Sequence, residues 1–247
     1  MDTAPIFNDI SGNYDRFNHL FSLNIDKSWR KSCARAAFRI ASDLAVSRGV
    51  EVSAIKVLDL ACGTGDLSIA LAKRGLKVTG VDISEGMLEK GREKVERLWK
   101  GKYSRYPRPE LGKGDGAALA FADGSVDIVT IGYGIRNFDD RPSSLREIMR
   151  VLSPGGALLI LEFGQPRNAF MRMLYKPYFK YAIPGMASVM TKGKDKAAYT
   201  YFISSVEKFP KFEKFCGELS ESGFMDVGFK SQTGGISVLY RAFKPIV

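Results

Sequence analysis

Histidine is almost absent from this chain, and cysteine is scarce. His19 is the single histidine among 247 residues, so a metal site built from several histidines is excluded. A Ser-His-Asp or Cys-His triad would have to use that one residue. The three cysteines, Cys33, Cys62 and Cys216, are odd in number and widely spaced. They fit neither a disulfide framework nor a zinc site, and we expect a protein of the reducing cytoplasm with no metal.

Long apolar runs are also missing. The longest, Ala157–Leu161, ends at Glu162 and is far shorter than the roughly 18 residues that cross a bilayer. The first residues include Asp2 and Asp9 and show no basic start followed by an apolar stretch, so the sequence predicts no secretion signal.

The overall charge is strongly positive. The chain has 37 basic and 27 acidic residues, a net charge of +10 and a pI near 9.5. This balance favours an anionic partner, either nucleic acid or an acidic membrane surface, although a soluble enzyme can be basic without one. With 45% hydrophobic and 26% charged residues, the composition is that of a globular protein and excludes a disordered one.

From residue 55 onward, short apolar runs alternate with segments of helical pattern. The expected strands are Ile55–Leu60, Leu76–Asp82, Asp127–Ile131 and Ala157–Phe163, and the expected helices run from the turn at 61–66 through Lys73, from Ser84 to Lys100 and from Pro142 to Leu152. Such alternation predicts an α/β fold with a mostly parallel sheet and helices on both faces.

The two ends of the chain have other patterns. Residues 1–53 predict a helical cover that includes a helix from Asp26 to Arg48, stopped by Gly49. A helix is expected over Phe209–Ser220, and the runs Met225–Lys230 and Ile236–Phe243 predict a closing hairpin. No linker divides the chain, so residues 1–247 are expected to form one domain.

The most informative motif follows the first strand. Asp59 lies in that strand, and Gly63 and Gly65 in the next turn let the backbone approach a ligand at the carboxyl edge of the sheet. A pyrophosphate-binding loop would place a third glycine at Ser68, and Asp59 and Asp66 disfavour a phosphate. A ligand with positive charge and hydroxyl groups, such as S-adenosylmethionine, fits better.

Two further stretches support a nucleoside ligand. Asp82 ends the second strand about 20 positions after the glycine turn, where a carboxylate accepts hydrogen bonds from ribose hydroxyls. Gly114-Asp115-Gly116 is placed to flank an adenine. The structural alternative is that these glycines only form tight turns and the aspartates only cap helices. Cys62 is interpreted as a packing residue.

At this point the chain resembles the class I S-adenosylmethionine-dependent methyltransferases, in Asp59–Asp66 and Asp82. More narrowly, it resembles the menaquinone/ubiquinone biosynthesis C-methyltransferases. The residues that carry this resemblance are Tyr14-Asp15, Asn18, Ser22, Trp29-Arg30, Gly134–Phe138, Arg150–Leu152 with Pro154–Gly156, and Leu161–Phe163. The resemblance covers nearly the whole chain. It implies a Rossmann-like sheet of seven strands with an antiparallel last strand. It also implies transfer of a methyl group to a ring carbon of a polyprenylated quinol, with demethylmenaquinol as the leading candidate.

The resemblance also implies residue roles. Thr64 would approach the methionine part of S-adenosylmethionine, Asp82 the ribose and Asp115 the adenine edge. The candidate cofactor residues are Asp59, Gly63, Thr64, Gly65, Asp82, Ile83, Asp115, Gly116 and Gly132. The candidate catalytic residues are Arg136 and Asn137 beside the methyl group, and Tyr14, which would close over it together with Asp15.

The reaction needs alignment, exclusion of water and stabilisation of a developing phenolate. Arg136 could hold that phenolate or ease proton removal through a water, but it is too basic to be the base itself. The structural alternative for Arg136 is an ion pair with Asp139 or Asp140. Two positions depart from the signatures, which usually have histidine at Asp26 and serine at Gly164; they leave the identity of the quinol open. His19 is interpreted as a surface or hinge residue, with a proton-handling role as the alternative.

An aromatic and basic insertion spans residues 164–200. Its cations are Arg167, Arg172, Lys176, Lys180, Lys192, Lys194 and Lys196, against Asp195 alone. Interleaved aromatic residues make it a candidate lid that touches an anionic membrane; binding of nucleic acid, or simple packing on the sheet, are the alternatives.

Three rival functions remain open from the sequence. The acceptor could be a benzoquinol of the ubiquinone pathway, the substrate could be RNA, or the chain could bind S-adenosylmethionine without turnover. No RNA-binding module is visible, so no nucleic-acid partner is expected. We expect a cytoplasmic enzyme, peripheral at the inner face of the membrane, and the sequence leaves room for a homo-oligomer.

Overall fold

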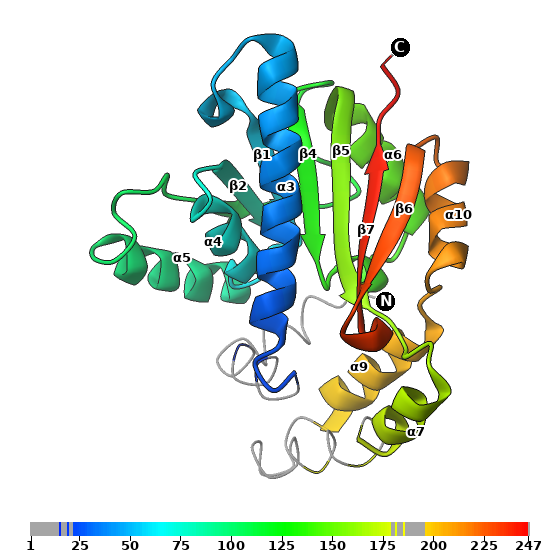
Figure 1. Ribbon diagram of the computed structural model, residues 1–247. Helices are drawn as coiled ribbons and strands as arrows, with labels where there is room; N and C mark the ends of the chain where they lie inside the picture. Colours follow the sequence, from blue (N-terminus) through cyan, green and yellow to red (C-terminus); the bar gives the residue numbers. More distant parts are fainter. Residues whose placement is uncertain are drawn as a thin grey trace.

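The computed structural model describes residues 15, 19, 22–178, 181, 185 and 196–246. Its centre is a seven-stranded sheet in the order β3-β2-β1-β4-β5-β7-β6 (Figure 1). β3, β2, β1, β4 and β5 are parallel neighbours, whereas β7 runs antiparallel between β5 and β6. The predicted fold class is therefore confirmed. The strands are β1 (Lys56–Leu60), β2 (Lys77–Asp82), β3 (Glu110–Lys113), β4 (Val126–Gly132), β5 (Leu152–Phe163), β6 (Met225–Gln232) and β7 (Ser237–Phe243).

Helices cover both faces of the sheet, because successive strand residues point to opposite sides and both sets are apolar. Val57 and Ile128 pack with α3, α4 and α5 on one face, and Leu58 and Val129 pack with α6 and α10 on the other. The helices are α3 (Asp26–Arg48), α4 (Asp66–Ala72), α5 (Glu85–Trp99), α6 (Arg141–Val151), α7 (Ala169–Pro177), α9 (Lys196–Lys208) and α10 (Glu213–Glu221), with 3-10 turns η1 (Val52–Ala54), η2 (Ile135–Asn137) and η4 (Thr233–Gly235).

Local signals set several helix ends as predicted. Gly49 ends α3 in the left-handed conformation, with φ +64°, and its N–H donates to the carbonyl of Val46. Ser84 caps α5, and its side chain accepts a hydrogen bond of 3.3 Å from the N–H of Met87. η4 connects β6 and β7, which pair as the expected hairpin.

Three local predictions were wrong. β3 was not expected as a strand, because its four residues show no apolar alternation; it forms by pairing with β2, where Leu111 lies opposite Gly80. α9 was missed as a separate helix. The helix expected over Phe209–Ser220 begins only at Glu213, because Phe212 takes φ +56° and interrupts the helical backbone.

Gly164, one of the two signature departures, directly follows β5. A Cβ atom at this position would lie 2.3 Å from the backbone oxygen of Gly235 and 2.7 Å from Cγ2 of Val238. The N–H of Gly164 donates to the carbonyl of Ile236 at 2.9 Å, so the backbone is held against the turn before β7. Close approach of two backbone segments therefore leaves no room for the side chain of a serine here.

Candidate functional site

The turn between β1 and α4 uses both glycines that the sequence singled out. Gly63 and Gly65 have φ of +54° and +79°, a region that disfavours side chains. Across from this turn, a Cβ atom at Gly80 would lie 2.6 Å from the side chain of Leu111 and 3.0 Å from Sγ of Cys62. The side chains of Leu111 and Cys62 therefore pack directly on the backbone of Gly80, where a larger residue would displace them.

Asp82, at the end of β2, is held in a fixed orientation. Its Oδ2 accepts a hydrogen bond of 2.7 Å from the N–H of Gly63, and its Oδ1 accepts one of 2.8 Å from the N–H of Ser84. Burial raises the pKa of Asp82, while the N–H groups of Ser84 and Gly63 act in the opposite direction. The carboxylate is therefore anchored to both sides of the site.

A pocket of about 250 Å³ opens beside Asp82. Five of the predicted site residues line it: Asp82, Ile83, Asp115, Gly116 and Asn137. Leu60, Ala61 and Phe138 add apolar walls, and the remaining lining residues are Gly114, Ala117, Asp139, Asp140 and Ser144. An apolar slot edged by carboxylates suits a flat base joined to a sugar with free hydroxyl groups.

Asp59 lies beneath the turn and is fully buried. Its Oδ2 accepts a hydrogen bond of 2.5 Å from the hydroxyl of Ser68, and its Oδ1 accepts one of 2.8 Å from Thr130. Burial raises the pKa of Asp59 to about 6, although these two hydrogen bonds favour the ionised form. Asp59 therefore ties β1 to α4 and β4 and shapes the turn from below.

The variant Asp59→Asn tests this burial cost. The pKa of Asp59 in the folded state is about 6, above its usual 3.8, so the folded protein holds this proton more tightly than the unfolded chain does. The resulting stabilisation is complete below pH 3.8 and is lost as the pH rises through about 6. Asparagine fits the same space, and the two hydroxyls can rotate to match its oxygen and its NH₂ group. The free energy of unfolding of Asp59→Asn, relative to wild type, is expected to rise by about 1 kcal/mol between pH 5 and pH 7. Urea titrations at both pH values measure this difference, and a constant difference would contradict the assignment.

At the end of β4, Gly132 packs against Leu67, and η2 follows with Arg136 and Asn137. The Nη1 of Arg136 lies 3.0 Å from Oε1 of Glu162, and the side chains are 5% and 0% exposed. The proposed structural alternative, a pair with Asp139 or Asp140, named the wrong partner. Glu162 lies on β5, the neighbour of β4, so strand order brings together two residues that are 26 positions apart.

The helix α9 covers this end of the sheet. Phe163 and Phe202 place their ring centres 5.4 Å from the guanidinium carbon of Arg136. The hydroxyl of Tyr201 donates to Oδ1 of Asn137 at 3.1 Å. Both candidate catalytic residues in η2 are thus fixed by a helix that sequence reasoning missed, because neither contact has a local sequence signal.

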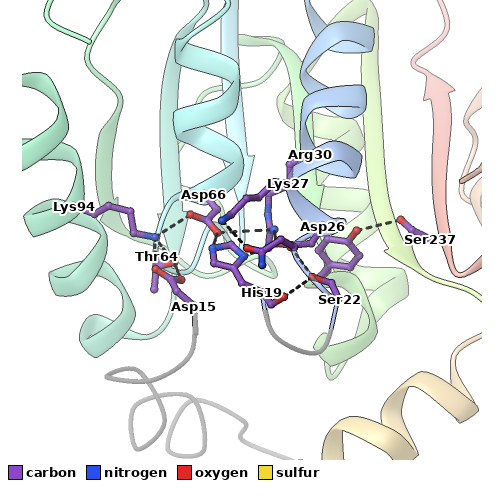
Figure 2. Close-up of polar contacts among 12 residues, drawn as sticks. Asp15, His19, Ser22, Asp26, Lys27, Arg30, Thr64, Asp66, Lys94 and Ser237 are labelled. Carbon is purple, nitrogen blue, oxygen red and sulfur yellow. Dashed lines mark hydrogen bonds and ion pairs between the residues drawn. The ribbon is translucent and has the colours of Figure 1, made fainter. Parts of the chain in front are cut away.

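Residues of the N-terminal segment reach the glycine turn (Figure 2). Asp15 accepts a hydrogen bond from the hydroxyl of Thr64 and forms an ion pair with Lys94, which also lies 2.9 Å from Asp66. Asp15 was expected to close over the methyl group, and these contacts place its carboxylate beside Thr64 and Lys94. Tyr14, the other residue expected there, lies outside the described residues.

Asp26, the second signature departure, is buried at the start of α3. Its carboxylate contacts His19 at 2.8 Å and Ser22 at 2.5 Å, and it forms an ion pair with Arg30 (Figure 2). Burial opposes ionisation of Asp26, but His19 and Arg30 outweigh it and hold its pKa well below the usual range. His19 is therefore a partly buried partner of Asp26 rather than a free surface residue.

Comparison with known proteins places these features in a wider group. The model of the ubiE/COQ5 methyltransferase family matches residues 2–244. A curated demethylmenaquinone methyltransferase of Staphylococcus aureus is 37% identical over 242 residues, which cover 97% of this chain and 91% of the relative.

Solved structures support the fold. A methyltransferase of Thermotoga maritima, described as a possible histamine N-methyltransferase, has a TM-score of 0.57 and 20% identity, with 97% of this chain and 98% of that chain covered. A SAM-dependent methyltransferase of Aquifex aeolicus has a TM-score of 0.53 and 19% identity, with 78% and 82% covered. At such identities, the likeness bears on the fold alone.

Proposed function

The chain belongs to the ubiE/COQ5 methyltransferase family, and we propose from this premise that it methylates a ring carbon of a polyprenylated hydroquinone. Demethylmenaquinol is the proposed acceptor, and S-adenosylmethionine is the methyl donor. The observation that carries the proposal is the similarity to a curated demethylmenaquinone methyltransferase, which extends over nearly the full length of both chains.

The pocket at the end of β2 fits the donor. Asp82 presents an oriented carboxylate for the ribose hydroxyls, and Asp115 lies at the edge where the adenine would bind between Ile83 and Phe138. Gly63, Thr64 and Gly65 would border the methionine part, with Asp59 beneath them and Gly116 and Gly132 leaving room. In this proposal, the carboxylates lie beside the ribose and the adenine of the donor, and the glycine turn lies beside its methionine part.

S-adenosylmethionine supplies an activated methyl group when it is bound, and the chain supplies alignment and charge. The acceptor hydroxyl must lose its proton so that electron density reaches the ring carbon. Arg136 places the positive end of its ion pair with Glu162 where the phenolate develops, and because its side chain is 5% exposed it acts without direct contact with bulk water. Asn137, held by Tyr201, orients the acceptor, and the segment with Tyr14 and Asp15 excludes water.

We also propose that residues 1–247 form one methyltransferase domain in which 164–200 is a lid that touches the membrane. On α7, Phe170 and Met173 are 63% and 60% exposed, and the neighbouring Arg172 is exposed too. Tyr175 and Tyr178 pack toward α9, so α7 is attached by its aromatic side. An exposed pair of apolar residues beside a cation suits brief contact with anionic lipids. Within the described residues, every helix is too short or too polar to span a bilayer.

The test is an incubation of the purified protein with labelled S-adenosylmethionine and, separately, demethylmenaquinol, a ubiquinone-pathway benzoquinol and bulk RNA. Label in the naphthoquinol is the expected result. Label only in a benzoquinol would move the enzyme to the ubiquinone pathway while keeping the mechanism. Label only in RNA would overturn the quinol assignment, and binding of S-adenosylmethionine without turnover would overturn the enzymatic one.

A further inference from the structure

The imidazole of His19 lies between two carboxylates beside the glycine turn (Figure 2). Its Nδ1 is 2.8 Å from Oδ2 of Asp26, the first residue of α3, which is the distance of a hydrogen bond. Its Nε2 is 3.7 Å from Oδ2 of Asp66, the first residue of α4, which is too long for one. Nδ1 is therefore held in place, whereas Nε2 has no hydrogen bond to the residues that the structure describes.

Asp26 determines which ring nitrogen carries the proton. Burial opposes its ionisation, but His19 and Arg30 outweigh burial and hold the pKa of Asp26 well below the usual range. An ionised carboxylate only accepts hydrogen bonds, so Nδ1 of a neutral His19 must be the donor. The lone pair is then on Nε2. Ser22 donates to Oδ1 of Asp26 at 2.5 Å and fixes the carboxylate in turn.

The charges around His19 are suited to receiving a proton. The charged residues that face it from the N-terminal segment, α3, α4 and α5 are Asp15, Asp26, Arg30, Asp66 and Lys94. Three carboxylates stand against two permanent cations, so a proton on the imidazole balances this group, which we call the His19 cluster. Burial opposes ionisation of Asp66, but Arg30 and Lys94 outweigh it and lower its pKa. An imidazolium would thus have a carboxylate on both edges.

The His19 cluster lies between the two parts of the proposed site. Asp66 directly follows Gly65 in the turn proposed to border the methionine part of the donor. On the other side, the guanidinium carbon of Arg30 is 5.4 Å from the ring centre of Tyr133. The carbonyl of Tyr133 accepts a hydrogen bond from Nη1 of Arg136. A single residue therefore connects the His19 cluster to the group proposed to hold the phenolate.

Other carboxylates near the site have partners of their own. Asp82 accepts hydrogen bonds from two backbone N–H groups, and Glu162 pairs with Arg136. The side chain of His19 is 23% exposed, whereas Asp26 on its Nδ1 edge is 3% exposed. The accessible edge of the ring is therefore the one that contains Nε2. His19 thus combines a lone pair with access for a reacting hydroxyl.

We propose that Nε2 of His19 accepts the proton of the acceptor hydroxyl, and that Asp26 is the positioning residue for this base. The inference rests on the proposed function, methylation of a hydroquinone ring. The electron pair of the broken O–H bond stays on the oxygen and reaches the ring carbon, which forms the bond to the methyl group. The pair of the broken S–C bond stays on the sulfur.

The remaining protons balance over one turnover. The methylated ring carbon loses its hydrogen as a proton to solvent, and the C–H electron pair restores the aromatic ring. His19 returns its proton to the oxygen, so one proton is released. As the donor loses its positive charge, the proton on His19 replaces it, and the charge of the site stays constant. A site that keeps its charge during transfer needs little reorganisation.

The first test needs neither donor nor acceptor. His19 is the single histidine of the chain, so its ring signals are identified without further assignment in a protein that carries no histidine tag. Nitrogen-15 NMR of labelled histidine measures the tautomer. We expect the neutral ring to carry its proton on Nδ1, because Asp26 accepts there. A neutral ring with its proton on Nε2 would overturn the positioning role of Asp26 and the base role of Nε2.

The second test measures methyl transfer to demethylmenaquinol as a function of pH. In wild type the rate should rise between about pH 5 and pH 8, as His19 loses its resting proton and becomes able to accept another. His19→Gln keeps a donor for Asp26 but is no base, so its kcat near neutral pH should fall about 100-fold and this rise should disappear. Its S-adenosylmethionine affinity, from calorimetry, should stay within about threefold of wild type.

Two further variants separate a base from a structural tie. His19→Lys keeps a cation beside Asp26 and Asp66 but is protonated at neutral pH, so it should be as slow as His19→Gln. The matched control is Lys27→Gln. Lys27 is an exposed neighbour in the same segment that donates to Asn24, and its variant should have the rate and pH profile of wild type.

The outcomes distinguish this inference from the proposed function. If wild type methylates demethylmenaquinol and His19→Gln keeps its pH profile, the base role of His19 is wrong and the proposed function stands. Full activity of His19→Lys, or a loss confined to S-adenosylmethionine affinity, would likewise make His19 only an anchor of the N-terminal segment. A wild type that methylates no quinol would overturn the proposed function and this inference together.

Discussion

Replacement of Glu162 by alanine is expected to lower the free energy of unfolding by about 3–5 kcal/mol, because it leaves the buried guanidinium of Arg136 without its counter-ion. The carboxylate of Glu162 also accepts hydrogen bonds from the N–H groups of Phe163 at 2.8 Å and Arg136 at 3.4 Å. Alanine removes these acceptors as well. Chemical denaturation of wild type and variant measures the loss.

A double replacement separates the structural role of this pair from its chemical role. Arg136→Met/Glu162→Leu removes both charges and keeps apolar volume between Phe163 and Phe202, so most of the lost stability should return. Methyl transfer should be lost in this double variant, because the guanidinium of Arg136, the positive end of the ion pair, is gone. A double variant that is stable and fully active would show that Arg136 serves only the fold, and a Glu162→Ala loss below about 1 kcal/mol would contradict the buried-pair argument.

Replacement of Asp82 by alanine is expected to weaken S-adenosylmethionine binding on the order of 100-fold, with little change in the sheet. A charged acceptor that binds sugar hydroxyls contributes about 1.5–3 kcal/mol for each hydrogen bond. In the wild type, the Asp82 carboxylate accepts hydrogen bonds from the N–H groups of Gly63 and Ser84 and so fixes the turn and the start of α5. The variant leaves both N–H groups without this acceptor. Isothermal titration calorimetry measures the dissociation constant.

The matched control for this experiment is Asp123→Ala. Asp123 is 80% exposed and pairs with Arg150 at the surface, away from the pocket. Its loss should leave the dissociation constant unchanged. If Asp82→Ala bound S-adenosylmethionine within threefold of wild type while the control behaved as expected, the ribose assignment would be wrong.

Much of the site could be predicted because its signals are local. The glycines at 63 and 65 are required by backbone conformation within one turn, and Asp82 follows from the length of one strand-helix-strand unit. Gly49 and Ser84 end and begin helices through contacts within four residues. Each of these features depends on residues close to one another in the chain.

Other features had no such signal. β3 is a strand because β2 offers it hydrogen bonds, and Phe212 interrupts a helix that its neighbours favour. The two signature departures left the identity of the quinol open when read from the sequence. In the structure, Asp26 is the buried partner of His19, Ser22 and Arg30, and Gly164 allows two backbone segments to touch.

The sequence by itself determined the alternation of strands and helices, the glycine turn and the place of Asp82, because backbone preferences and hydrophobic periodicity act over a few residues. Only the tertiary structure decided that Arg136 pairs with Glu162 and that both side chains are buried. Ion pairs and burial depend on distances of a few ångströms in space. Those distances follow from the order of strands in the sheet, which no short stretch of sequence encodes.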